Sequence, residues 1–179
     1  DKWKSTGEMG ELRYIRISMN GSDWIAGGFN DLITTKEQYP AMETEPLPDD
    51  MDGETFKKYV LFVNFYIHQI NLLRYLFSEP YHITYTDTQG TLLTTESESG
   101  KTGILEMSTY NSGKVWHETV FVAMNKGFIE INLPAPLASY RAGKVRIFSD
   151  TREDAPAQTI VPQMPRVHAM LQQARNFVE

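Results

Sequence analysis

The sequence predicts an α+β fold: a single antiparallel sheet of about six to eight strands packed on one long central helix, with a C-terminal amphipathic helix. Two observations favour this class. In residues 59–77, fourteen of nineteen residues are apolar or aromatic, which suits a buried helix. Residues 81–149 instead alternate polar and apolar residues in short runs divided by turn residues. Such short connections favour antiparallel neighbours.

The composition is that of a folded domain and excludes several classes of protein. Hydrophobic residues make up 41% of the 179 residues, which is enough for a core, so we expect one domain over residues 1–179. The net charge of −6 is spread along the chain without a basic cluster, so no nucleic-acid partner is expected. Because the sequence has no cysteine, disulfides, thiolate zinc sites and a cysteine nucleophile are excluded.

The chain begins with Asp1 in place of methionine, which favours a processed or excised segment. Together with the absence of cysteine, this leads us to expect a periplasmic or extracellular location. It also leaves room for a membrane anchor outside the given chain. The oligomeric state is not indicated.

Residues 11–29 are expected to form a β-hairpin. The first half is rich in β-forming residues, Asn20-Gly21 is a strong signal for a two-residue turn, and the second half provides the returning strand. The same Asn20 begins a glycosylation sequon, but the turn explains it equally well. Residues 30–52 contain three prolines and no periodicity. We therefore expect residues 1–50 to be a loosely attached hairpin lobe and linker.

A long helix is expected over residues 53–78. Asp52 can cap its first amide groups, and Glu54 lies near the positive end of the helix dipole, while Pro80 forces its end. A β-strand over residues 59–67 is the alternative, but a stretch of about 25 residues without Gly or Pro is too long for a typical strand. Polar residues inside the run favour a buried helix over a membrane-spanning one.

Six strands are expected after Pro80, each bounded by turn residues: 81–87, 91–97, 103–108, 114–124, 128–133 and 144–149. A loop over residues 150–164 separates them from a second helix over residues 165–178, which starts at Pro165. This helix should dock on the domain through one apolar face, made of Val167, Met170, Leu171, Ala174 and Phe177.

Several motif-like segments fail as catalytic or metal sites. Residues 98–103 (ESGKTG) suggest a phosphate loop, but its first glycine is replaced by Thr95 and a strand-like run follows in place of a helix. The acidic residues 49–54 lack carboxylates at both ends of a calcium loop. The four histidines have no metal-ligand spacing. We therefore expect no metal, no cofactor and no catalytic residue.

Three carboxylates, Glu106, Glu118 and Glu130, each lie in a different candidate strand. They could form a catalytic pair if those strands are neighbours. Strand alternation more simply places all three on the solvent face.

A polar stripe on the long helix is the strongest candidate site. Lys57, Asn64, His68 and Asn71 lie within about 60° of one another at 100° per residue. Asn64, His68 and Asn71 are predicted to bind a ligand in a pocket between the helix and the sheet, where a few polar groups orient a mostly apolar molecule. One alternative is that the stripe is the solvent-exposed edge of an amphipathic helix. Another is that part of the apolar surface of the helix is a protein interface.

Residues 83–95, ITYTDTQGTLLTT, form a strand–turn–strand with a T-D-x-x-G turn after a long helix. This segment resembles the corresponding hairpin of PAS-like and Cache-type sensor domains. The resemblance implies a sensor-like fold.

These observations favour a non-enzymatic, extracytoplasmic binding module, a ligand-binding or sensor-like domain for a small apolar or amphiphilic ligand. The alternative is a structural protein–protein interaction domain of a larger envelope, secretion or surface assembly, which would bind a protein partner. An enzyme without recognisable motifs is the third hypothesis.

Overall fold

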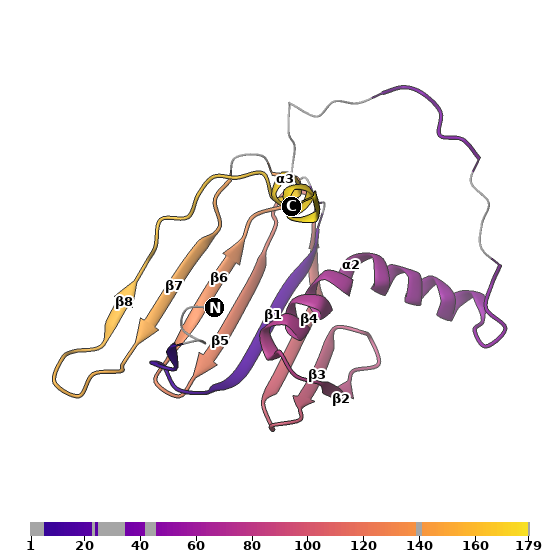
Figure 1. Cartoon of the computed structure of the whole chain (residues 1–179). Helices are drawn as coiled ribbons and strands as arrows, with labels where there is room; N and C mark the ends of the chain where they lie inside the picture. Colours follow the sequence, from indigo (N-terminus) through magenta and orange to yellow (C-terminus); the bar gives the residue numbers. More distant parts are fainter. Residues whose placement is uncertain (1–5, 23, 25–34, 42–45, 139–140, 179) are drawn as a thin grey trace.

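The computed structural model describes residues 6–22, 24, 35–41, 46–138 and 141–178. They form one eight-stranded sheet, a long helix and a C-terminal helix, labelled in Figure 1. The helices are α2 (Gly53–Phe77) and α3 (Ala169–Val178). The strands are β1 (Leu12–Ser22), β2 (Tyr81–Thr86), β3 (Leu92–Ser97), β4 (Thr102–Ser112), β5 (Glu118–Met124), β6 (Gly127–Leu133), β7 (Lys144–Ser149) and β8 (Gln158–Ile160).

The strands lie in the order β2-β3-β4-β1-β5-β6-β7-β8. Strand β1 is central, parallel to β4 and antiparallel to β5, and the other neighbouring pairs are antiparallel. The predicted fold class is confirmed, with a sheet that is mixed because of one parallel pair. Since β1 lies in the middle of the sheet, residues 12–22 belong to the core of the domain and are not part of a loosely attached lobe.

The predicted turn at Asn20-Gly21 is wrong, because β1 continues through both residues. The Asn20 side chain is buried. It donates to the Val115 carbonyl at 3.1 Å and accepts from the His117 amide at 2.9 Å. The side chain thus ties β1 to the segment that leads into β5, and its burial argues against glycosylation. Of the returning strand predicted over residues 23–29, all but Trp24 lies outside the described residues.

The six strands predicted after Pro80 are confirmed with small changes at their ends. Strand β4 is longer than predicted because it pairs with β1 as far as Ser112. Strand β5 begins at Glu118, later than predicted. The short edge strand β8 was missed and falls in the segment expected to be a loop.

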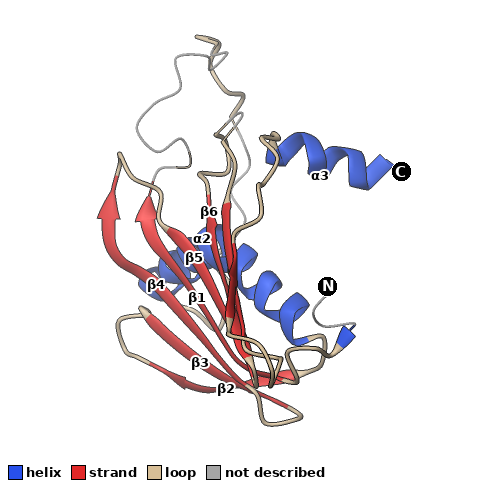
Figure 2. Cartoon of the chain, turned by 90° about the vertical axis from the view of Figure 1, so that its left-hand side faces the viewer, coloured by secondary structure: helices blue, strands red, loops and turns tan. Residues whose placement is uncertain are grey.

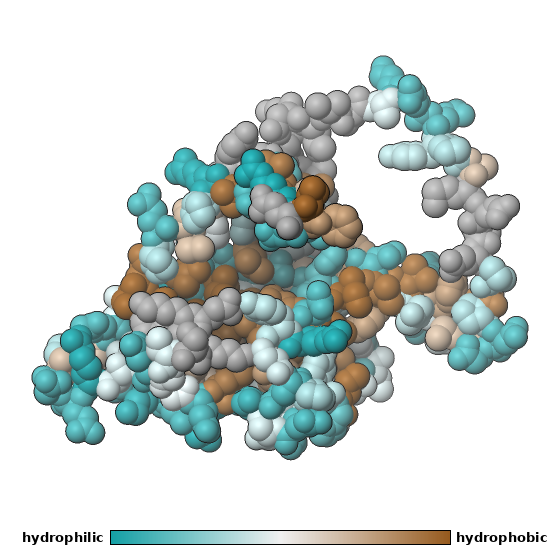
Figure 3. All heavy atoms as spheres, in the orientation of Figure 1, coloured by the Kyte–Doolittle hydropathy of each residue, from teal (hydrophilic) through white to brown (hydrophobic). Residues whose placement is uncertain are grey.

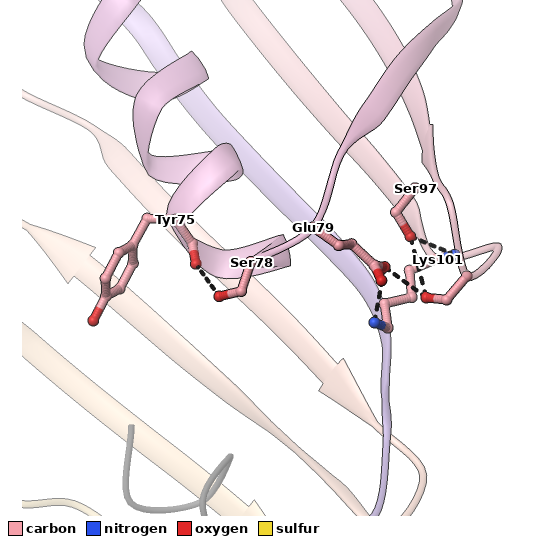
Figure 4. Close-up of polar contacts among 6 residues, drawn as sticks. Tyr75, Ser78, Glu79, Ser97 and Lys101 are labelled. Atoms are coloured by element: carbon pink, nitrogen blue, oxygen red, sulfur yellow. Dashed lines mark hydrogen bonds and ion pairs between the residues drawn. The ribbon is translucent and has the colours of Figure 1, made fainter.

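The predicted long helix is confirmed as α2, and its ends follow from local hydrogen bonds. Asp52 caps it by accepting from the Thr55 amide at 2.7 Å. At the other end Ser78 adopts a left-handed conformation with φ 56°. Its amide bonds to the Arg74 carbonyl at 3.1 Å, and its hydroxyl donates to the Tyr75 carbonyl at 2.8 Å, as Figure 4 shows. These bonds end the helix just before Pro80.

The second half of α2 packs on one face of the sheet, behind it in Figure 2. Tyr66, Leu73 and Phe77 are buried against a core that is shared by β1, β3, β4 and β5. At Gly103 on β4, a Cβ atom would lie only 2.8 Å from the Phe77 ring and 3.0 Å from Leu73. The glycine therefore allows the helix to approach the sheet closely.

The first half of α2 extends beyond the sheet in Figure 1 and carries no buried side chain before Tyr66. Tyr59, Leu61 and Ile67 are 50%, 58% and 47% exposed. Figure 3 shows hydrophobic atoms, in brown, along the projecting part of the helix. Within the described residues, no helix combines the length and hydropathy needed to cross a membrane.

The C-terminal helix forms, but its predicted docking is wrong. Helix α3 begins at Ala169, four residues after Pro165, and has no buried residue. Leu171 is 48% and Phe177 92% exposed. Its apolar face finds no partner surface among the described residues.

Candidate functional site

The polar stripe lies on the outer side of α2. Asn64, His68 and Asn71 are all exposed, as is Lys57. The opposite side of the helix, with Leu73 and Phe77, fills the space against the sheet. The predicted pocket between helix and sheet is therefore wrong for the described residues: that space is a packed core, and the stripe faces away from it.

His68 is held by a residue from a distant part of the sequence. The Trp24 ring meets the His68 ring edge-on, with centroids 5.8 Å apart and planes at 73°. The Trp24 carbonyl accepts a hydrogen bond from the Leu137 amide at 3.3 Å. The segment beyond β6 thus positions Trp24, which in turn restricts the imidazole. The sequence offered no signal for this contact.

The residue after His68 points the other way, into the core. Gln69 is buried, and its amide nitrogen donates to the Glu118 carboxylate at 2.6 Å. The second oxygen of Glu118 accepts from the Trp116 indole at 3.2 Å. The Gln69 amide nitrogen also lies 3.1 Å from the Met19 sulfur, and its oxygen has no partner among the described residues. A buried polar pair therefore joins α2 to β5.

Burial raises the pKa of Glu118 above its ordinary value. The hydrogen bonds from Gln69 and Trp116 oppose this shift, as does attraction to His68. The sequence prediction placed Glu118 on the solvent face, which is wrong. Alternation along β5 gives the reason, because Glu118 shares the buried face with Val120 and Val122.

Glu106 and Glu130 lie on the face of the sheet away from α2. Both line a shallow hollow of about 320 Å³, together with Arg16 and His117. Glu130 is paired with Arg146, which donates to it at 2.7 Å. Glu118 faces the opposite side, so the three carboxylates do not meet.

Lys101, in the segment that suggested a phosphate loop, is already paired. Its ammonium lies 2.8 Å from the Glu79 carboxylate, as seen in Figure 4. This contact and hydrogen bonds from Ser97 and Ser99 lower the pKa of Glu79 to about 2. An open hollow of about 760 Å³ lies beside Lys101, at the end of the sheet. No group of three metal-ligating side chains occurs in the described ranges.

The hairpin that resembles sensor domains is β2–β3, and its turn is explained by Asp87. The Asp87 carboxylate accepts from the amides of Thr91 at 2.7 Å and Leu92 at 2.9 Å. Bonds from Thr91 and Leu92 lower the pKa of Asp87. The T-D-x-x-G pattern therefore reflects local turn chemistry.

No protein-family model matches the sequence, and no curated protein matches it significantly. Solved structures do match the fold. The 3-ketoreductase KijD10 from Actinomadura kijaniata, solved with NADP, is 12% identical, with a TM-score of 0.55 over 98% of this chain and 45% of that one. A proposed NADPH-dependent oxidoreductase from Desulfitobacterium hafniense is 14% identical, with a TM-score of 0.55 over 97% of this chain and 48% of that one. The chain spans just under half the length of these proteins.

At this level of identity the likeness shows the fold alone, which this chain shares with part of each of these two proteins. The prediction of a non-enzymatic binding module is wrong, and so is its alternative, a structural interaction domain. The expectation that the chain is not an enzyme is contradicted by the same fold. The physical reason is that a fold does not fix a function: the same arrangement of a helix on a sheet occurs within oxidoreductases.

Proposed function

We propose that this chain is the substrate-side domain of an NAD(P)-dependent oxidoreductase that reduces a ketone or oxidises a secondary alcohol. The observation that carries the proposal is the match of nearly the whole chain to one part of such proteins. The exposed apolar side chains of α2 support it, since Tyr59, Leu61 and Ile67 offer a surface that a second domain can cover.

The described residues do not fit a nicotinamide dinucleotide. A dinucleotide places its pyrophosphate at a helix N-terminus that follows a glycine-rich turn. In α2 that position holds Asp52, which already accepts the Thr55 amide, and Glu54 lies in the first turn. Two carboxylates there repel a phosphate, so we derive no step in which this chain holds the cofactor.

The polar stripe is the part of the chain that we propose to face the substrate. Asn64 and His68 are four residues apart and Asn71 follows three later, so all three share one side of the helix. Interconversion of a ketone and an alcohol needs a group that gives or takes a proton at the substrate oxygen, and histidine suits that task near neutral pH. The Asn64 and Asn71 amides can donate to and accept from neighbouring hydroxyl groups.

The test is an assay of NAD(P)H oxidation with a panel of ketones, using the protein purified from its source with any subunit that accompanies it. We expect turnover with at least one ketone. His68→Ala should lower kcat by about 10²- to 10⁴-fold, and Asn64→Ala should mainly raise KM. Lys144→Ala, at an exposed position on strand β7, serves as the control. The proposal fails if the protein neither binds NAD(P)H nor oxidises it with any ketone.

A further inference from the structure

Glu118 is a carboxylate inside the mainly apolar layer between α2 and the sheet. It is 8% exposed, and its neighbours Val120 and Val122 on the same face belong to the core. Each of its oxygens accepts one hydrogen bond, from Gln69 and from Trp116. Of these partners, Gln69 is next to His68 in the helix.

Packing alone does not require a charge at this position. A glutamine there has nearly the same shape: its oxygen could accept from Trp116, and its NH2 group could donate to the Gln69 oxygen if the Gln69 amide turned over, because that oxygen has no partner among the described residues. The carboxylate instead carries the cost of burying a negative charge. A group that costs stability where a neutral isostere would fit is a candidate for a functional role.

The groups around Glu118 show where its charge can act. On α2, Gln69 donates a hydrogen bond to Glu118, and His68 attracts its negative charge. In the sheet its neighbours are Met19 on β1 and Leu133 on β6, neither of which titrates. Among the described residues, His68 is the titratable side chain whose attraction lowers the pKa of Glu118.

We infer that Glu118 is a positioning residue for the polar stripe. Through Gln69 it fixes the second half of α2 against β5, and its negative charge acts on His68 from the inner side of the helix while Trp24 contacts the imidazole ring. This inference rests on the proposed function in one respect, that His68 is the group that exchanges a proton with substrate.

The first test needs no substrate. The side-chain carboxyl carbon of Glu118 is followed by NMR against pH in the 179-residue chain, in wild type, His68→Ala and Asn64→Ala. We expect His68→Ala to raise the pKa of Glu118, because it removes the attraction that lowers it, and Asn64→Ala to leave it unchanged. An equal Glu118 midpoint in wild type and His68→Ala would overturn the inference.

The second test uses the oxidoreductase assay. Glu118→Gln keeps a hydrogen-bonding partner for Gln69 but removes the charge, so we expect kcat to fall by about 10- to 100-fold with KM little changed. Glu130→Gln, on the other face of the sheet, is the matched control. Full activity in Glu118→Gln would refute the positioning role. If no oxidoreductase activity exists at all, the proposed function fails, whereas the NMR coupling of Glu118 to His68 is decided independently.

Discussion

At the scale of single residues, Glu118 and Glu79 respond to their surroundings in opposite directions. Burial raises the pKa of Glu118, whereas Lys101, Ser97 and Ser99 lower that of Glu79 to about 2. As the pH rises, the contribution of Glu118 to the stability of the folded protein should therefore fall, whereas that of Glu79 should grow.

Glu118→Gln should stabilise the protein at pH 8 and have less effect at pH 4. The folded-state pKa of Glu118 is raised, so its contribution to stability is fully present below the ordinary value of 4.5 and is lost as the pH rises through the folded pKa. The neutral amide avoids that loss. Melting temperatures of both proteins at the two pH values measure this, and a variant that melts below wild type at pH 8 would contradict it.

Lys101→Met should lower the melting temperature at pH 7 and have a smaller effect near pH 2. The pKa of Glu79 is depressed, so the stabilisation from its ion pair is present above about 4.5 and is lost as the pH falls towards about 2. Thermal melts at both pH values test the prediction, with Lys144→Met on the exposed strand β7 as the control. An equal loss at both pH values would show that Lys101 acts through packing alone.

At the scale of elements, the sequence predicts that α2 packs on the sheet but not which part of the helix does so. The apolar run predicts a helix that is buried along its whole length, yet Phe62 and Ile70 are only partly buried in the structure. The fully buried positions are Leu73 and Phe77, with Tyr66 nearly so. Composition alone could not show this, because it does not reveal that the first half of the helix extends past the sheet.

Leu73→Ala should lower the free energy of unfolding by about 2–5 kcal/mol, because it leaves a cavity in the core between α2 and the sheet. Leu61→Ala removes the same atoms from an exposed position and should change it by less than about 0.5 kcal/mol. Urea denaturation of both variants measures the difference. Similar losses in the two would mean that the first half of α2 is covered in solution.

Gly103→Ala should cost about 1–3 kcal/mol of stability, because its Cβ would approach Phe77 and Leu73 more closely than a packed core allows. Gly113→Ala is the matched control, since no atom lies within 4 Å of the Cβ that it adds. The same denaturation experiment applies. If the two variants are equally stable, α2 does not approach β4 as closely as the structure shows.

The sequence could predict elements better than their long-range pairing. The cap at Asp52, the stop before Pro80 and the turn at Asp87 are local, and each was visible in the residues around it. The parallel pairing of β1 with β4 joins segments more than eighty residues apart. The side-chain amide of Asn20 also donates a hydrogen bond to the distant Val115 carbonyl. The Asn20-Gly21 pair locally favours a turn, but the long-range contacts of Asn20 place both residues in a strand. No local pattern in the sequence indicates those contacts.

At the scale of the whole molecule, the polar stripe was found from helical spacing, but its surroundings were not. Asn64, His68 and Asn71 do share one side of α2, and that side faces out of the domain. The contact of Trp24 with His68 and the bond from Gln69 to Glu118 depend on how distant segments fold together. Apolar side chains such as Leu61 and Ile67 are also exposed on α2, so hydropathy alone could not tell which apolar positions meet the sheet.

Helix α3 lies outside the packed core of the molecule. Because α3 buries none of its residues, deletion of residues 165–179 should shift the melting temperature by less than about 2 °C. Leu73→Ala, which disrupts the core, provides the contrasting large shift. If α3 instead serves to contact a second domain or subunit through Leu171 and Phe177, the deletion should leave the fold intact and weaken that association, as measured by size-exclusion chromatography. A large loss of stability in the isolated chain would show that α3 packs on the sheet in solution after all.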